Sequence, residues 1–396
     1  MPMSRHSTET VELSRGALKV VVAPRLGGRI AEFSLCGRNL LFENPALAGV
    51  ENDQPTPAWD GVWRNFGGEK VWVAPQGWDG KGQWAGPPDP VLDGGYFSLL
   101  AADSEKISTR SPDDPKTGLR IDRTISLLDG QSGVNVDASL TDVSGGGGEW
   151  SIWPVVQVRA DENTSITFPS PDGFRVLHGV VNNPQFGIDE CGNCEVSYKY
   201  IMGKIGANTN AGWVACTDTA NGTAFVASCD FLQSARYPQG TNVQVWTSGR
   251  GSIFSRGVLR TAADDPVGNP PYMEIELLSP LTKIGAGGSF GFSYKLRACA
   301  VPRGATVKSL FGLGVLTEKL SVERRGGAAF ATASAGAFAA GKIGVFDELG
   351  NALCEPVEVS PERGARISAE IPQSAGKIKL EYFNSAGRLK IEEFEL

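Results

Sequence analysis

Two glutamates, Glu274 and Glu276, lie two positions apart in an apolar segment and could together transfer protons. The segment Tyr272–Leu278 reads YMEIELL, so in an extended strand both carboxylates share one face and the aliphatic side chains take the other. If that face lines a cleft, mutual repulsion and partial burial raise the pKa of one carboxylate and suit it to act as a base. A strand edge facing solvent is the alternative.

A second group of residues with chemical potential is aromatic. Five of the nine tryptophans occur close together: Trp59, Trp63, Trp72, Trp78 and Trp84. Polar residues lie between them: Arg64, Glu69, Lys70, Gln76 and Asp79. This mixture is unusual for a buried strand, and it suits a ligand that is apolar on one face and hydroxylated at its edges, as a sugar is. A small core packed under long loops is the alternative, because aromatic side chains dominate cores as well.

The segment Trp150–Arg159, WSIWPVVQVR, alternates as a strand does. Trp153, Gln157 and Arg159 share one face with Val155, so this strand is a candidate wall of a concave site. An outward, solvated face is the alternative.

Strand patterns occupy most of the chain, and helical patterns are rare. Extended runs recur from Val11 to Ala298, separated by glycine- and proline-bearing turns. Residues 44–63 and 77–95 read as long loops, and residues 182–210 read as an irregular excursion. At least a dozen short strands before Val301 predict a large antiparallel sandwich.

The composition changes after Val301, which predicts two domains, residues 1–300 and residues 301–396. A short helix is expected within Arg303–Ser321, and the remaining residues to Leu396 read as short strands broken by turns. We interpret residues 301–396 as an immunoglobulin-like accessory domain for packing, assembly or partner contact.

Composition and charge narrow the function. The formal net charge is −7 and no basic run occurs, which argues against a nucleic-acid partner and favours a small, weakly charged ligand. No stretch of 18 apolar residues predicts a membrane span, and no apolar stretch near the amino terminus predicts export, so a cytoplasmic location is expected. The sequence does not indicate an oligomeric state.

The seven cysteines are scattered over the chain and do not form a disulfide framework. Cys191 and Cys194 have the spacing of a redox or metal motif, but neither a second such pair nor a histidine pair accompanies them. We therefore expect no metal and no other cofactor.

Four separated motifs occur in one order along the chain. They are LGGRIAEF (26–33), FGGEKVWVAPQ (66–76), WPVVQV (153–158), and YMEIELLSP (272–280) followed by GGSF (287–290). Together they resemble the galactose mutarotase-like, or aldose 1-epimerase-like, superfamily over residues 10–300, and most closely an uncharacterised branch of it. The resemblance implies an all-β fold, a mutarotase-like β-supersandwich with a sugar cleft across one concave sheet, followed here by a small β-sandwich.

In aldose 1-epimerases a strand glutamate removes the anomeric hydroxyl proton, and a histidine protonates the ring oxygen. The resemblance places the glutamate at Glu274, or at Glu276 if a small gap is allowed. The histidine does not carry over, because the chain has only His6, near its start, and His178, in a segment that does not match the family's histidine motifs. His178 is either the donor or a structural histidine.

These observations lead to one expected function and one alternative. We expect a protein that binds a small-molecule carbohydrate, and aldose 1-epimerase activity or related chemistry at the anomeric centre. The alternative is a carbohydrate-binding protein that has lost the general acid and is not an enzyme. The expected catalytic residues are Glu274, Glu276, Lys70 and His178. The expected substrate-binding residues are Arg64, Trp72, Gln76, Trp78, Trp153, Gln157 and Tyr237. By residue type, Lys70, Arg64 and Tyr237 could also donate the proton.

Overall fold

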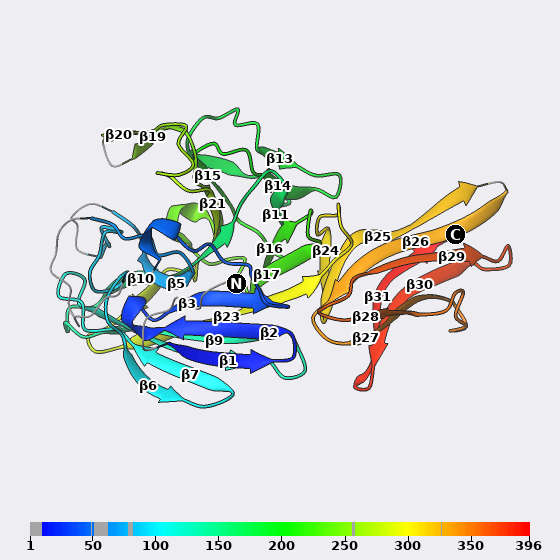
Figure 1. Cartoon of the computed structure of the whole chain (residues 1–396), viewed down its shortest axis with the longest axis horizontal. Coiled ribbons are helices and arrows are strands. Elements are labelled where there is room, and N and C mark those ends of the chain that lie inside the picture. The colour runs from blue at the N-terminus through cyan, green and yellow to red at the C-terminus, as the bar shows by residue number, and fades with distance from the viewer. Residues whose placement is uncertain (1–9, 49, 51–61, 78–81, 256–257, 326) are drawn as a thin grey trace.

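The computed structural model describes residues 10–48, 50, 62–77, 82–255, 258–325 and 327–396. Strands make up most of these ranges (Figure 1). The helical elements within them are three short 3-10 turns, η1 (Pro24–Leu26), η2 (Pro45–Leu47) and η3 (Pro238–Gly240). The protein is thus all-β, as the sequence predicts.

An eleven-stranded antiparallel sheet carries most of the residues singled out above. Its strands pair in the order β1-β2-β3-β5-β10-β21-β18-β15-β12, with β4 on β3 and β22 on β10. Their bounds are β1 Val11–Arg15, β2 Leu18–Ala23, β3 Arg29–Leu35, β4 Arg38–Asn39, β5 Glu69–Ala74, β10 Gly148–Arg159, β12 Arg175–His178, β15 Gly203–Ala207, β18 Val243–Thr247, β21 Tyr272–Leu277 and β22 Thr282–Ile284.

A ten-stranded antiparallel sheet packs against the first. It pairs in the order β13-β14-β11-β16-β17-β23-β9-β8-β7-β6. The bounds are β6 Ser98–Ala102, β7 Lys106–Arg110, β8 Leu119–Leu127, β9 Gly133–Asp142, β11 Thr164–Pro169, β13 Phe186–Ile188, β14 Asn193–Ser197, β16 Trp213–Asp218, β17 Thr223–Cys229 and β23 Ser289–Ala300. One hydrophobic core joins the two sheets, because side chains from β2, β3 and β10 cluster with side chains from β8, β9 and β23. A separate two-stranded hairpin, β19 (Gly251–Ser255) with β20 (Val258–Ala262), completes this part.

The last eight strands form two further sheets, which make the narrower body at the right of Figure 1. One sheet contains β24 Ser309–Phe311, β25 Gly314–Arg325, β26 Ala328–Ala337 and β29 Ala365–Ile371. The other contains β27 Gly341–Asp347, β28 Val357–Val359, β30 Lys377–Asn384 and β31 Gly387–Glu395. Strand β29 alternates buried and exposed residues, and its buried side chains cluster with those of β27 and β30 across the interface. The predicted small sandwich is present.

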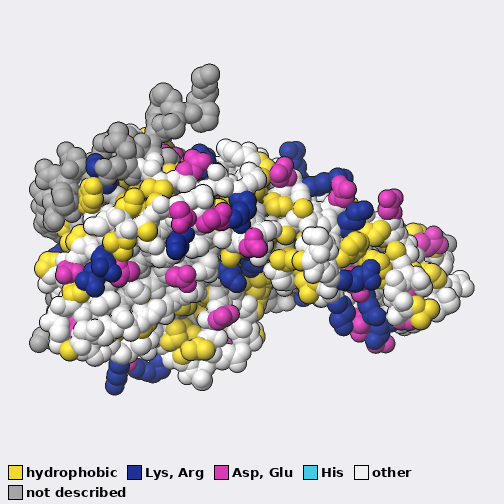
Figure 2. Space-filling view, turned by 90° about the horizontal axis from the view of Figure 1, so that it is seen from below, with side chains coloured by type: hydrophobic (Ala, Val, Ile, Leu, Met, Phe, Trp, Pro, Cys, Tyr) yellow, Lys and Arg dark blue, Asp and Glu magenta, His cyan; other side chains and the backbone are white. Residues whose placement is uncertain are grey.

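An apolar contact joins the small sandwich to the ten-stranded sheet. Trp213 and Val226 of the sheet cluster with Val307, Val315 and Phe338. Figure 2, turned by 90°, shows the same narrower end, with basic and acidic side chains interspersed along the visible face. That residues 1–300 and 301–396 are separate domains, and that the second is immunoglobulin-like, both stay predictions.

Two expectations about local structure are wrong. No helix forms in Arg303–Ser321, which contains β24 and the start of β25. Leu316 and Leu320 have helical spacing in the sequence, but irregular pairing of β25 with β26 brings both into the small core. Residues 182–210 are not irregular throughout, since β13, β14 and β15 lie there; these strands of three to five residues are too short to show a clear period.

Strand β5 corrects a third expectation, because the tryptophan-rich stretch does contain a buried strand. All six of its residues are buried. Glu69 faces the ten-stranded sheet and accepts hydrogen bonds from Arg123 and Tyr294 there. The next residue, Lys70, faces the opposite side and lies over the ring of Trp72. Burial of the strand is supported on one face by the pairing of Glu69 with Arg123 and on the other by the ring of Trp72 beside Lys70.

Candidate active site

Strand register gathers the candidate residues on one face of the eleven-stranded sheet. Directly paired residues of antiparallel strands project to the same side. Three such rows are Trp72–Trp153, Lys70–Val155–Glu276–Gln244 and Gln157–Glu274–Trp246–Lys204–His178. Because neighbouring Glu69 points into the sandwich, these rows occupy the outer face of the sheet.

Glu274 is the carboxylate with the most perturbed surroundings. Its side chain is buried at the centre of the face and accepts a hydrogen bond from Gln157 Nε2 at 2.7 Å. Burial raises the pKa of Glu274 above its ordinary value of 4.5; the cation of Lys70 lowers it in part, and the charge of Glu276 raises it further. Such a carboxyl exchanges its proton closer to neutral pH than an exposed glutamate does.

Glu276 is held by two donors. Lys204 Nζ lies 2.7 Å from Glu276 Oε2, and Trp153 Nε1 donates to the same oxygen at 2.9 Å. The same Nζ lies 5.0 Å from the ring centroid of Trp153. Lysine, glutamate and tryptophan therefore form one compact unit, in which the position of each side chain fixes the others.

Lys70 and Gln157 are buried beside the two glutamates. Lys70 Nζ and Gln157 Oε1 are buried atoms without a hydrogen-bond partner in the described ranges. Burial lowers the pKa of Lys70, and the neighbouring Glu274 opposes this effect. Lys70 is thus placed to act on Glu274 through its charge.

Tryptophans frame the face, and a single aspartate binds the indole nitrogens of two of them. Trp72 lies against Trp153 at a ring-centroid distance of 5.3 Å in an edge-on arrangement. Asp93 accepts hydrogen bonds at 2.9 Å from the indole nitrogens of both Trp72 and Trp63. Trp72 is buried, whereas Trp63 is 36% exposed. Of this pair, Trp63 has the ring surface that a ligand could cover.

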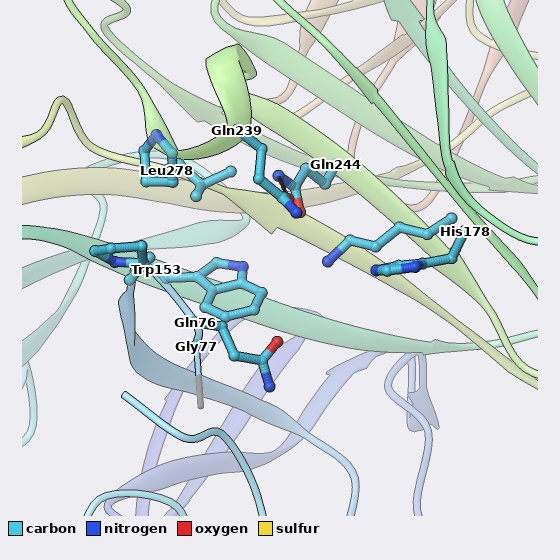
Figure 3. A pocket seen from close by; sticks show the side chains of 11 residues that line it. Gln76, Gly77, Trp153, His178, Gln239, Gln244 and Leu278 are labelled. Carbon is cyan, nitrogen blue, oxygen red and sulfur yellow. Dashed lines mark hydrogen bonds between the residues drawn. The ribbon is translucent and has the colours of Figure 1, made fainter. Parts of the chain in front are cut away.

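Above this face lies a cleft with two compartments. The glutamate compartment, of about 300 Å³, is lined by Glu274 and Glu276 together with Trp63, Trp72, Trp246, Tyr272 and Arg260. The amide compartment, of about 230 Å³, is lined by Gln239 and Gln244 together with Pro75, Pro238 and Leu278. Both share a wall made of Gln76, Trp153, His178 and Lys204. Figure 3 shows the amide compartment, with the indole of Trp153 between Gln76 and the two amides.

Most of the predicted site residues meet here. The two carboxylates predicted to be catalytic line the cleft, with His178, Trp72, Trp153 and Gln76, and Lys70 and Gln157 lie behind it. Arg64 is exposed and is not among the residues that line either compartment. Tyr237 is buried outside the cleft, where its hydroxyl bonds the backbone of Leu232. Trp78 lies outside the described residues.

Sequence reasoning missed Lys204, Gln244 and Trp246. Gln244 and Trp246 occur at alternate positions of a segment that reads as a strand, the same signal that drew attention to the two glutamates. Lys204 gave no such signal, because its strand β15 was hidden in a segment without clear periodicity.

The cysteine motif lies away from this cleft. Cys194 is buried in β14, and all seven cysteines are free thiols. Across the described ranges, no group of three or more histidine, cysteine, aspartate or glutamate side chains is arranged to hold a metal ion. In the same ranges no helix is long and apolar enough to cross a membrane.

Comparison with known families gives one match that covers most of the chain. Residues 8–260 match the model of DUF4380, a domain of unknown function. The chain belongs to this family. The match takes in β5 and β10, whereas the two glutamates of β21 lie beyond its end. A comparison with curated proteins found no match.

Several of the solved structures similar to this DUF4380 protein are galactose mutarotase-like proteins or related enzymes. A galactose mutarotase-like protein from Lactobacillus casei is 9% identical with a TM-score of 0.49, covering 73% of this chain and 100% of that one. A galactose mutarotase-like protein from Clostridium acetobutylicum is 12% identical with a TM-score of 0.45, covering 74% and 95%. A galactose mutarotase related enzyme from Lactobacillus acidophilus is 10% identical with a TM-score of 0.43, covering 74% and 98%.

Proposed function

We propose that this DUF4380 protein binds a sugar in the glutamate compartment and interconverts its anomers, with Glu274 as the base. One observation carries the proposal: a buried carboxylate of raised pKa faces a cavity framed by tryptophans. Burying a charge lowers the stability of a protein. Glu274 lines a cavity and lies within ion-pair distance of no described lysine or arginine, and a carboxylate in such a position is a candidate for a chemical role.

The reaction requires two proton transfers. Glu274 takes the proton of the anomeric hydroxyl as the carbonyl forms, the bond between the anomeric carbon and the ring oxygen breaks, and a donor protonates that oxygen. Rotation about the neighbouring carbon–carbon bond and reversal of the same steps give the other anomer. Both groups recover their protonation states, so no oxidant or co-reactant is needed.

Lys204 is the donor that the geometry favours. It lines the cleft, lies over the face of Trp153 and carries its positive charge beside Glu276. His178 is less suitable, because burial and the charge of Lys204 lower its pKa and leave it neutral near pH 7. Lys70 is behind the lining, so its role is to keep the Glu274 carboxylate ionised.

The same observation about His178 favours the competing function, a sugar-binding protein that is not an enzyme. A histidine that is neutral near pH 7 is a weaker acid than its cation, and Lys204 is already engaged by Glu276. If the Lys204 proton does not reach the ring oxygen, the cleft binds a sugar and leaves its anomers unchanged.

Polarimetry of freshly dissolved glucose and galactose distinguishes the two functions. The protein should speed anomerisation, and Glu274→Gln should lower that rate by about 10²-fold or more while sugar binding, followed by tryptophan fluorescence, persists. Glu162→Gln, an exposed glutamate outside the cleft, is the matched control. Binding without faster anomerisation would establish the binding function, and full activity of Glu274→Gln would refute the assignment of the base.

A further inference from the structure

The cleft continues beyond the glutamates. Trp153 stands between the two compartments and lines both, with Gln76, His178 and Lys204 completing the shared wall. The two volumes, about 300 and 230 Å³, lie at and below the lower end of the range for ligand pockets, about 300 to 1,000 Å³. A ligand that fills the whole cleft is therefore larger than one that fills the glutamate compartment alone.

The amide compartment has the chemistry of a binding site. Gln244 Nε2 donates to Gln239 Oε1 at 2.9 Å (Figure 3). It also donates to Thr241 Oγ1 at 2.8 Å, and the two bonds together orient both amides. Both hydrogens of Gln244 Nε2 are used in these bonds, so Gln244 offers Oε1 as an acceptor and Gln239 offers Nε2 as a donor, the combination that recognises vicinal hydroxyls. Pro238 and Leu278 supply apolar surface beside them.

The backbone at Gln239 is unusual in a way that points to this compartment. Gln239 has φ 54° and ψ 14°, a left-handed conformation that side-chain-bearing residues adopt at a cost of about 1 kcal/mol or more. Gly240 follows it with φ 65°. A glycine at position 239 would avoid the strain, whereas the residue found here carries a side chain that lines the amide compartment.

We propose that the amide compartment is a second sugar subsite, so that the ligand is a reducing disaccharide. This inference rests on the proposed function. The reducing unit lies at Glu274 and the second unit lies against Gln239 and Gln244, with the glycosidic linkage passing Trp153. The second unit is uncharged, because Lys204, the one lysine or arginine among the described residues that line this compartment, is already paired with Glu276.

Calorimetric titration with matched sugars tests the inference: glucose with maltose, cellobiose and lactose, whose reducing unit is glucose, and galactose with galactobiose, whose reducing unit is galactose. For the recognised sugar, the disaccharide should bind the wild-type protein about tenfold more tightly, the effect of one or two net hydrogen bonds. Gln239→Trp should fill the amide compartment and reduce disaccharide affinity to that of the monosaccharide or below. Monosaccharide affinity should not change.

A second variant tests whether a loss of binding in Gln239→Trp comes from misfolding. Gln239→Gly removes the side-chain amide at a position whose backbone conformation glycine adopts without strain. This variant should bind the disaccharide no more tightly than the monosaccharide, and its affinity for the monosaccharide should equal that of the wild type. Gln233→Trp, on the exposed turn before η3 and outside the cleft lining, is the matched control and should behave as wild type.

Each outcome decides a separate point. Equal affinity for a monosaccharide and all of its disaccharides, unchanged by Gln239→Trp, would overturn the second subsite and leave the proposed function intact. Absence of binding for every sugar would overturn the proposed function and this inference with it. A disaccharide advantage that survives both Gln239 variants would show that the second unit lies elsewhere.

Discussion

Replacing Lys204 by methionine should destabilise the protein by about 3 to 5 kcal/mol, the cost of leaving one partner of a buried ion pair alone. The charged atoms of Lys204 and Glu276 are 2.7 Å apart, with side chains 10% and 1% exposed. At an effective dielectric constant of about 20, unit charges at that separation attract by roughly 6 kcal/mol, part of which offsets their desolvation. Methionine keeps the apolar stem, so the change isolates the charge.

The double variant Lys204→Met with Glu276→Gln should recover most of this loss. It removes both charges together, and the glutamine oxygen can still accept from Trp153 Nε1. Urea unfolding followed by tryptophan fluorescence is the assay, since three tryptophans lie on this sheet face. A loss below about 1 kcal/mol in the single variant would mean that the pair behaves as an exposed one, and the reasoning about the site would fail.

Three more predictions concern the pH dependence, the inner ion pair and the aromatic wall. The anomerisation rate should fall as pH is lowered, with a midpoint above 4.5, the ordinary pKa of a glutamate. The variant Lys70→Met should move this midpoint to higher pH, because the lysine cation lowers the pKa of Glu274. Because the pKa of Glu274 is higher in the folded than in the unfolded protein, this group adds to the free energy of unfolding at low pH, and that contribution is lost as pH rises through the folded-state pKa. The free energy of unfolding of Glu274→Gln, measured in urea, should therefore depend less on pH than that of the wild type. Glu69→Gln should cost about 3 to 5 kcal/mol in thermal or urea unfolding, since it leaves a fully buried guanidinium without its carboxylate. Trp246→Ala should weaken sugar binding in fluorescence titration without lowering the urea midpoint much, because its ring is only partly buried, whereas Trp153→Ala should lower both.

The strands could be predicted from the sequence because buried and exposed side chains alternate along them. Glu274 and Glu276 share a face in the structure for the reason that their spacing indicates, and so do Trp153 and Gln157. Which side of the sheet they occupy could not be read, because it depends on where the second sheet packs. Glu69 illustrates this: its partner Arg123 lies 54 residues away in the sequence, on the opposing sheet.

The proposed proton donor, Lys204, was the least predictable part of the candidate site. Lys204 reaches Glu276 through β15 and β18, whose order in the sheet is set by long-range pairing. No local pattern reports such an order. Tyr237 shows the converse: a residue of a suitable type whose hydroxyl is used by the backbone of a nearby turn.

The hairpin β19–β20 supplies Ile253 and Arg260 to the wall of the glutamate compartment, yet its ladder has only two strands. Two strands alone are marginally stable in water, whereas the floor of the cleft belongs to an eleven-stranded sheet. Amide hydrogens of this hairpin should therefore exchange with solvent through local opening, at a free energy far below that of global unfolding. A sugar that contacts Arg260 would slow this exchange while leaving the exchange of β10 and β21 unchanged. Sugar binding in the cleft could therefore be followed by amide hydrogen exchange of the hairpin alone.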